Sequence, residues 1–523
     1  MPVQLEWTGL EVRALRDAMR ETRLGFCEVA GVRFDTLRKW ERRSHTLTLR
    51  AVNAAIMDTI LARATDEQRD RFRLRCAELR RQPEGIQAAE PGDVRHVELL
   101  RTNTGPAVAN PHPHLRLHPG DHEPIAASDS ETVHSRSNPV SPLAGSTGEP
   151  LIRTPAGRYF LGSVTPVVLV PAVLDSGRIL AASTDAVALN PILLRPHRSM
   201  IVATVNTAEG VSFYGLDRRR ARARSHASNP GAPLLIPQAY QLDDFTLGIT
   251  WAVTNLDDAL LDDDAELAAA ELRLHTLDCR ALSLAGPELA AELSVASQMW
   301  LGSQFCARHI LDHADQLSDT PFFWTREQRG EEASTWLLFT HKYQYLQSTA
   351  ATFASTGRTL TRAFCIPPDS VTASRRPERV LLLLTAALIE SFGVTVAVCI
   401  EPEYTAVQGF VLDRDRRAII ATWINTNRFW HADITDHRPT LHEFSDASEW
   451  ARTHSILTAP TPLLRLHTLS DYLQLDWTWL TRRARDLADT GTVGLIRPRS
   501  RLLSLAGLDK SLRFLADLAR EDR

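Results

Sequence analysis

Residues 19–43 read MRETRLGFCEVAGVRFDTLRKWERR, and this stretch decides the fold expected at the start of the chain. Thr22 is placed to cap a short helix, from which Phe26 and Ala30 would face inward. Gly31 then supplies a tight turn, because glycine adopts turn conformations that other residues reach only at a cost. The stretch therefore opens with one amphipathic helix that ends at a defined turn.

A second helix is expected after this turn, with Val32 packed between the two. Leu37 and Trp40 lie three residues apart and face inward from the second helix. Its outer face then consists of Phe34, Asp35, Arg38, Lys39 and Arg42. A helix presented in this way fits the DNA major groove, where the base edges differ in their hydrogen-bond donors and acceptors. The pattern predicts a helix-turn-helix.

The same residues resemble the Cro/CI-type, or XRE-family, helix-turn-helix regulators. The frame F-x-x-x-A-G-V-x-x-x-T-x-x-x-W-E matches without a gap at Phe26, Ala30, Gly31, Val32, Thr36, Trp40 and Glu41. The opening WTG-x-EVRALR pattern, from Trp7 to Arg16, looks like the actinobacterial branch of that family. The resemblance covers residues 7 to about 80. It implies a transcriptional regulator that binds double-stranded DNA.

The resemblance also implies which residues contact DNA. The recognition helix would be the one that holds Phe34, Asp35 and Lys39, and Arg23 would meet a phosphate. The chain departs from the family at the heads of both helices, where glutamine or serine is common and Arg23, Arg33 and Phe34 stand instead. The expected DNA-binding set is Arg23, Arg33, Phe34, Asp35, Arg38, Lys39, Arg42 and Arg43.

The distribution of charge agrees with a local DNA-binding surface. The whole chain of 523 residues has a net charge of -4, so no global basic field indicates a nucleic-acid partner. Residues 1–81, however, contain 17 Lys and Arg against 12 Asp and Glu, a balance of +5, while the remainder balances -9. The basic excess is found where DNA would bind.

Composition divides the chain into three parts. Residues 1–81 are helical by period, with capping boxes at Thr8 and Glu11 and at Thr65 and Gln68. Residues 82–150 contain ten prolines among Gly, Ser, Asn and His without an apolar period, which predicts a flexible linker. We expect a multidomain protein in which an all-α helix-turn-helix domain (1–81) is joined by this linker to an α+β region (151–523).

The C-terminal region combines β-type runs with helical periods. It forms either one region or two subdomains, 151–370 and 371–523. Residues 240–350 are mostly helical by period, and residues 469–519 return to helix. Strands are expected at 158–161, 164–173, 200–205, 394–400, 409–412, 418–424 and 430–434, and buried or amphipathic helices at 267–277, 289–313 and 378–392.

Aromatic residues concentrate between positions 300 and 345, with charged residues among them. The aromatic members are Trp300, Phe305, Phe322, Phe323, Trp324, Trp336, Phe339, Tyr343 and Tyr345, and the polar members are Arg326, Glu331, Glu332, His341 and Lys342. One interpretation is a pocket that binds a small effector. The other is a packed helical core with a polar rim.

An enzyme tethered to DNA is the main alternative function. Cys306 and His309 lie three apart on an expected helix, and His431, Asp433, Asp436 and His437 cluster after a strand. A thiol nucleophile needs a base and a group that orients the base, which the second cluster could supply in space. The motifs of zinc proteases, P-loop NTPases and α/β-hydrolases are absent from the sequence. We therefore expect no catalytic residues.

Metals and cofactors are not expected either. The histidines at 112, 114, 118 and 122 are flanked by prolines and lack a cysteine or acidic partner at a fixed spacing. The six cysteines form no CxxC pair, the N-terminus lacks the apolar core of a signal peptide, and no apolar run is long enough to cross a bilayer. These features favour a cytoplasmic protein without a membrane partner.

A homodimer is expected because one short recognition helix reads only a few base pairs. Phe72, Cys76 and Leu79 form a narrow apolar stripe after Thr65, which makes this helix the candidate interface. The C-terminal region is the alternative source of the interface. The sequence thus favours a DNA-binding regulator whose C-terminal region senses a small-molecule or protein effector, or mediates assembly. A protein-interaction module at residues 1–81 is a further alternative.

Overall fold

A computed structural model of the chain separates into two units, residues 1–96 and residues 97–523. The structure describes residues 7–19, 26, 30, 32, 36, 37, 40, 41, 48, 49, 51–81, 151–183, 198–207, 210–227, 231–275, 282–285, 293–317, 320–353, 360–414, 416–423 and 430–521. The linker expected at 82–150 lies outside these described residues.

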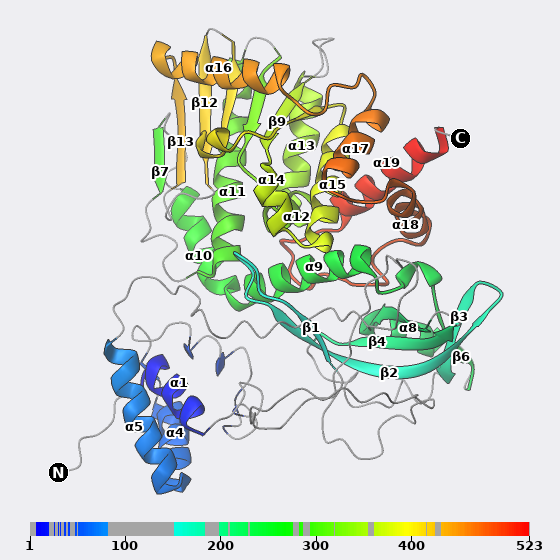
Figure 1. The fold of residues 1–523 in the computed structure, drawn as a ribbon. Helices are drawn as coiled ribbons and strands as arrows, with labels where there is room; N and C mark the ends of the chain where they lie inside the picture. Colours follow the sequence, from blue (N-terminus) through cyan, green and yellow to red (C-terminus); the bar gives the residue numbers. More distant parts are fainter. Residues whose placement is uncertain are drawn as a thin grey trace. The chain divides into compact units, whose positions relative to one another are not determined.

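Helices form the described part of the N-terminal unit (Figure 1). They are α1 (Gly9–Ala18), α4 (Ala51–Arg63) and α5 (Asp66–Arg81). The capping box at α1 is confirmed, because the Thr8 side chain accepts from Leu10 N–H and the Glu11 carboxylate accepts from Thr8 N–H at 3.0 Å. Thr65 and Gln68 exchange the same pair of bonds at α5.

Two sheets and their helices make up the C-terminal unit, which confirms the α+β class expected for this region. The six-stranded sheet has the order β5-β4-β2-β3-β6, with β1 paired to β2. Its strands are β1 (Leu151–Thr154), β2 (Ser163–Asp175), β3 (Arg178–Ser183), β4 (Met200–Thr207), β5 (Gly210–Asp217) and β6 (Pro233–Ile236). Strands β2 and β4 are parallel, and the other pairs are antiparallel.

The expected strand at 158–161 is wrong, whereas those at 164–173 and 200–205 correspond to β2 and β4. Residues 155–162 form no strand, and two of their backbone N–H groups bond a side chain from a distant helix instead of a neighbouring strand. The carboxylate of Glu331 accepts from Tyr159 N–H at 2.7 Å and from Phe160 N–H at 3.3 Å. A loop is therefore held against the start of a helix.

The seven-stranded sheet has the order β10-β9-β8-β11-β12-β13-β7. Strands β8, β9 and β10 are parallel, and the rest of the sheet is antiparallel. Its strands are β7 (Leu282–Ala285), β8 (Phe322–Thr325), β9 (Thr361–Cys365), β10 (Thr395–Cys399), β11 (Phe410–Asp413), β12 (Arg417–Thr422) and β13 (Trp430–Thr435). Residue 370, considered as an internal boundary, falls between β9 and β10, which pair directly.

Helices cover both faces of the seven-stranded sheet. The longer helices of the unit are α8 (Arg218–Ala227), α9 (Asp244–Asp262), α10 (Asp264–His275), α11 (Val295–Asp312), α12 (Gly330–Leu338), α13 (Thr340–Phe353), α15 (Arg376–Glu390), α16 (Arg438–Thr453), α17 (Pro462–Tyr472), α18 (Trp477–Thr490) and α19 (Ala506–Glu521), and α14 (Pro368–Ala373) is a single short turn. Side chains at alternate strand positions explain this layering. Phe322 and Trp324 of β8 share a core with Leu441 and Phe444 of α16, whereas Phe323 belongs to the core of the opposite face.

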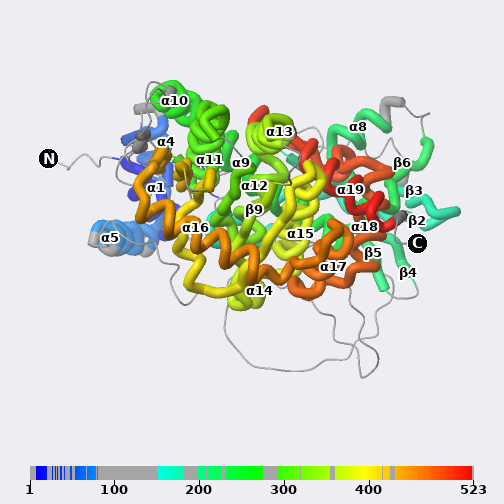
Figure 2. Tube along the Cα trace, turned by 90° about the horizontal axis from the view of Figure 1, so that it is seen from above, coloured from blue at the N-terminus to red at the C-terminus, as the bar shows by residue number. Residues whose placement is uncertain are grey.

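Helix α15 is central to the helical layer and contacts α9, α12, α17 and α19 (Figure 2). Its sequence RPERVLLLLTAALIE explains this position, because it is apolar nearly all round and twelve of its residues are buried. No helix in the described part of the chain is long and apolar enough to cross a membrane.

Candidate functional site

The eight residues expected to contact DNA lie outside the described residues. They are Arg23, Arg33, Phe34, Asp35, Arg38, Lys39, Arg42 and Arg43. Their inward-facing neighbours are described, and these show how the segment packs.

The expected inward positions of the helix-turn-helix are buried in the core of the N-terminal unit. Phe26 and Leu37 are completely buried, Ala30 and Trp40 nearly so, and Val32 packs against the same core. Every one of these positions except Val32 is helical. The predicted burial is thus confirmed for Phe26, Ala30, Leu37 and Trp40, and Val32 is partly buried.

Glu41, the last residue of the sequence frame, ties this segment to α1. Its buried carboxylate pairs with the Arg16 side chain, which also bonds Asp17 at 2.9 Å. Arg75 of α5 reaches the same Asp17 at 3.2 Å. Glu41, α1 and α5 are therefore linked by one network of ion pairs.

The apolar stripe proposed as a dimer interface is used inside the unit instead. Phe72, Cys76 and Leu79 are all at least nine-tenths buried in the core that contains α1. The rings of Phe72 and Trp7 stack with their centroids 5.8 Å apart. This expectation is wrong because the N-terminal segment from Trp7 onward, not a second copy, covers the stripe.

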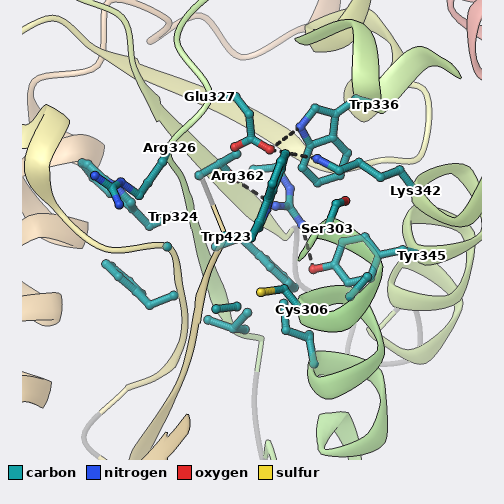
Figure 3. Close-up of a pocket in the computed structure, with 18 residues that line it drawn as sticks. Ser303, Cys306, Trp324, Arg326, Glu327, Trp336, Lys342, Tyr345, Arg362 and Trp423 are labelled. Atoms are coloured by element: carbon teal, nitrogen blue, oxygen red, sulfur yellow. Dashed lines mark hydrogen bonds and ion pairs between the residues drawn. The ribbon is translucent and has the colours of Figure 1, made fainter. Parts of the chain in front are cut away.

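A pocket in the C-terminal unit is the candidate ligand site (Figure 3). It lies between α11, α13 and the face of the seven-stranded sheet, near the carboxyl end of β8. It contains about 540 Å³ of space, its open mouth included. The lining residues are Ser303, Cys306, Ala307, Ile310, Phe323, Trp324, Thr325, Arg326, Glu327, Trp336, Lys342, Tyr345, Arg362, Gly409, Phe410, Val411, Ala421 and Trp423.

A buried ion pair forms one side of this pocket. Lys342 Nζ donates to Glu327 Oε1 at 2.9 Å, and Trp336 Nε1 donates to the same oxygen at 2.9 Å. The ammonium lies between two rings, 3.8 Å from the Trp336 centroid and 4.5 Å from that of Trp423. Burial lowers the pKa of Lys342 to about 8, although the Glu327 carboxylate opposes that effect.

A second buried cation, Arg362, extends from β9 into the helix-facing side of the sheet. Its terminal nitrogens donate to the hydroxyls of Thr325 at 3.0 Å and Tyr345 at 3.1 Å. Its guanidinium lies 4.5 Å from the Phe323 centroid and 4.8 Å from that of Trp336. Among the described residues, no carboxylate pairs with Arg362, and its Nε–H has no acceptor.

Helix α11 supplies a hydroxyl and a thiol to the pocket. Ser303 Oγ and His341 Nε2 share a hydrogen bond of 2.9 Å, and burial lowers the pKa of His341 well below its usual value. Burial also raises the pKa of the Cys306 thiol, so this sulfur is protonated at neutral pH. Both pKa shifts favour the uncharged forms of His341 and Cys306.

The alternative thiol site gains no geometric support within the described residues. His431 and Asp433 lie on β13, and His437 bonds Thr440 at 3.0 Å. No described hydrogen bond connects them to Cys306, and no group of three or more described His, Cys, Asp or Glu residues is arranged to hold a metal ion. The protonated thiol is also a poor nucleophile.

Sequence reasoning found about a third of the residues that line the pocket. The aromatic cluster at 300–345 supplies Trp336, Lys342 and Tyr345, but also many residues that are only core. Arg362 was missed although a signal exists. In the strand TRAFC it shares a face with Phe364, where a buried strand normally places an apolar residue. Trp423 follows β12, so only the folded sheet brings it to this site.

No family model, curated protein or solved structure matches the chain. Inference about its function therefore rests on its own residues.

Proposed function

We propose that this protein is a DNA-binding transcriptional regulator whose C-terminal unit binds a small effector. The observation that supports it most is the joint burial of Phe26, Ala30, Leu37 and Trp40 in the N-terminal core. Helical periodicity then assigns Phe34, Asp35, Arg38, Lys39 and Arg42 to the opposite, outer face, as a recognition helix requires.

Charge supports the same proposal. The balance of +5 in residues 1–81 provides the phosphate-binding term that non-specific affinity requires. Asp35 would accept from a cytosine amino group, and Lys39 would reach a guanine edge or a phosphate.

Genome-wide mapping of bound sites, followed by binding assays on the recovered fragments, tests the proposal. Lys39→Ala should weaken binding, and Asp35→Ala should relax base preference at one position, each by about 1 to 3 kcal/mol for a good base contact. Arg73→Ala is the matched control, because Arg73 is exposed on α5 and, among the described residues, pairs with Asp70.

The binding assays on the parent chain and on the two variants also distinguish the alternative functions. If the parent chain retains no DNA, residues 1–81 are instead a protein-interaction module. If both variants bind every site like the parent and the control, the assignment of the recognition helix is wrong.

The effector-binding half of the proposal rests on the pocket in the C-terminal unit. Small-molecule sites are typically concave, mostly apolar and equipped with a few oriented polar groups, as this pocket is. An effector that binds there should change DNA affinity.

A further inference from the structure

Arg362 is a cation of the pocket that forms no ion pair with any carboxylate in the described part of the chain. It is 5% exposed, so its guanidinium is removed from bulk water. Glu327 forms an ion pair with Lys342 at 2.9 Å, and Arg326 has the carboxylate of Glu332 in its surroundings. Arg362 has only hydroxyls and rings as described partners.

The aromatic rings alone do not satisfy the hydrogen-bond donors of Arg362. Cation–π contacts stabilise the delocalised charge, but they give the Nε–H no acceptor. A buried donor without an acceptor is costly and is rare in folded proteins. The sequence segments 354–359 and 424–429 contain no Asp or Glu, so neither of them offers a carboxylate to the Arg362 charge.

The residues around Arg362 restrict which ligand can pair with its guanidinium. Aromatic rings of Phe323, Trp336 and Trp423 and the side chains of Ile310 and Val411 form flat, apolar walls. One uncompensated positive charge calls for one negative charge. A planar carboxylate fits the edge of a guanidinium, whereas a doubly charged phosphate would bury an unpaired second charge.

We propose that the pocket binds a small aromatic monocarboxylate, with its carboxylate on Arg362 and its ring against the aromatic walls. This inference rests on the proposed function, since it names the effector class of the same regulator. Ser303, hydrogen-bonded to His341, lies at the pocket wall as a further polar group for a substituent of the ligand.

Ligand binding is tested on the purified full chain without DNA, by titration calorimetry and tryptophan fluorescence. The probes are benzoate and indole-3-carboxylate, with benzamide, benzylamine and inorganic phosphate as comparisons. Benzoate should bind saturably and at least tenfold more tightly than benzamide, because the two differ mainly in charge. Benzylamine and phosphate should not saturate the site.

Arg362→Gln should reduce benzoate affinity at least tenfold, whereas Arg438→Gln should leave it unchanged. Arg438 is the control because it is exposed at the start of α16, away from the pocket. Arg362→Lys keeps the charge without the planar edge and should be intermediate. If neither Arg362 variant folds by circular dichroism, the ratio of benzoate to benzamide affinity in the parent chain decides.

Equal affinity for benzoate and benzamide, saturation by phosphate, or full benzoate binding by Arg362→Gln would overturn the inference. None of these measurements involves DNA. Failure of the ligand-site proposal and failure of the DNA-binding proposal are therefore separate outcomes. A carboxylate that binds without changing DNA affinity would contradict only the proposal that the ligand regulates DNA binding.

Discussion

Lys342 shows how one buried side chain makes stability depend on pH. Its pKa is about 8 in the folded chain and near 10.5 when exposed, so between these values the unfolded chain binds more protons. Stability should therefore rise as the pH increases from 8 to 10.5, by about 3 kcal/mol at most.

Urea unfolding of the parent chain and of Lys342→Met at several pH values measures this contribution. The difference between the two proteins should change across that window and stay constant above it. A difference that is constant from pH 7 to 10.5 would mean that Lys342 titrates normally.

Trp40 gives a second prediction at the residue scale. Its side chain is 6% exposed in the N-terminal core, so Trp40→Ala should destabilise that unit by about 3 to 5 kcal/mol. Hydrogen exchange on the full chain should show lost protection at residues 7–81 and unchanged protection in the C-terminal unit. A protein that keeps its protection and only binds DNA weakly would place Trp40 at the DNA surface.

Two faces of helix α5 provide a matched pair of variants at the element scale. Phe72 is 5% exposed and stacks on Trp7, whereas Leu74 is 67% exposed. Phe72→Glu should unfold the N-terminal unit, because it buries a charge in an apolar core. Leu74→Glu should leave thermal unfolding unchanged. If Phe72→Glu folds normally but dissociates an oligomer, the apolar stripe of α5 is an oligomer interface.

The sequence predicts those helices and strands whose local pattern of apolar residues is enough to identify them. The apolar run of α15, and the short β-type runs near β10 to β13 separated by turn residues, are recognisable locally. Strand β8 is not, because FFWT is buried on both faces, shows no alternation and follows a long helix. Its identity comes from pairing with β9 and β11, which lie far along the chain.

The pocket residues also divide into those that the sequence reveals and those that only the fold brings together. Trp336 and Lys342 lie close in sequence and their aromatic setting is visible there. Arg362 and Trp423 come from separate strands, and the surplus charge becomes apparent only when each cation is matched with its carboxylate.

For the whole molecule, the proposed mode of DNA binding predicts dimers. A single recognition helix reads few bases, so two half-sites about one helical turn apart should be protected together. Footprinting combined with sedimentation measures this, and the C-terminal unit is the expected source of the interface. Protection of one isolated half-site by a monomer would rule the dimer out.

Strand β7 has a consequence for how the chain is made. Its partner β13 begins about 145 residues later, and no other strand in the described part of the chain pairs with β7. At about 5 to 20 residues per second, a ribosome would need roughly 7 to 30 seconds to reach that partner. During synthesis the N–H and C=O groups of β7 remain exposed to other nascent chains, so expression at a lower temperature or with holding chaperones should raise the soluble yield.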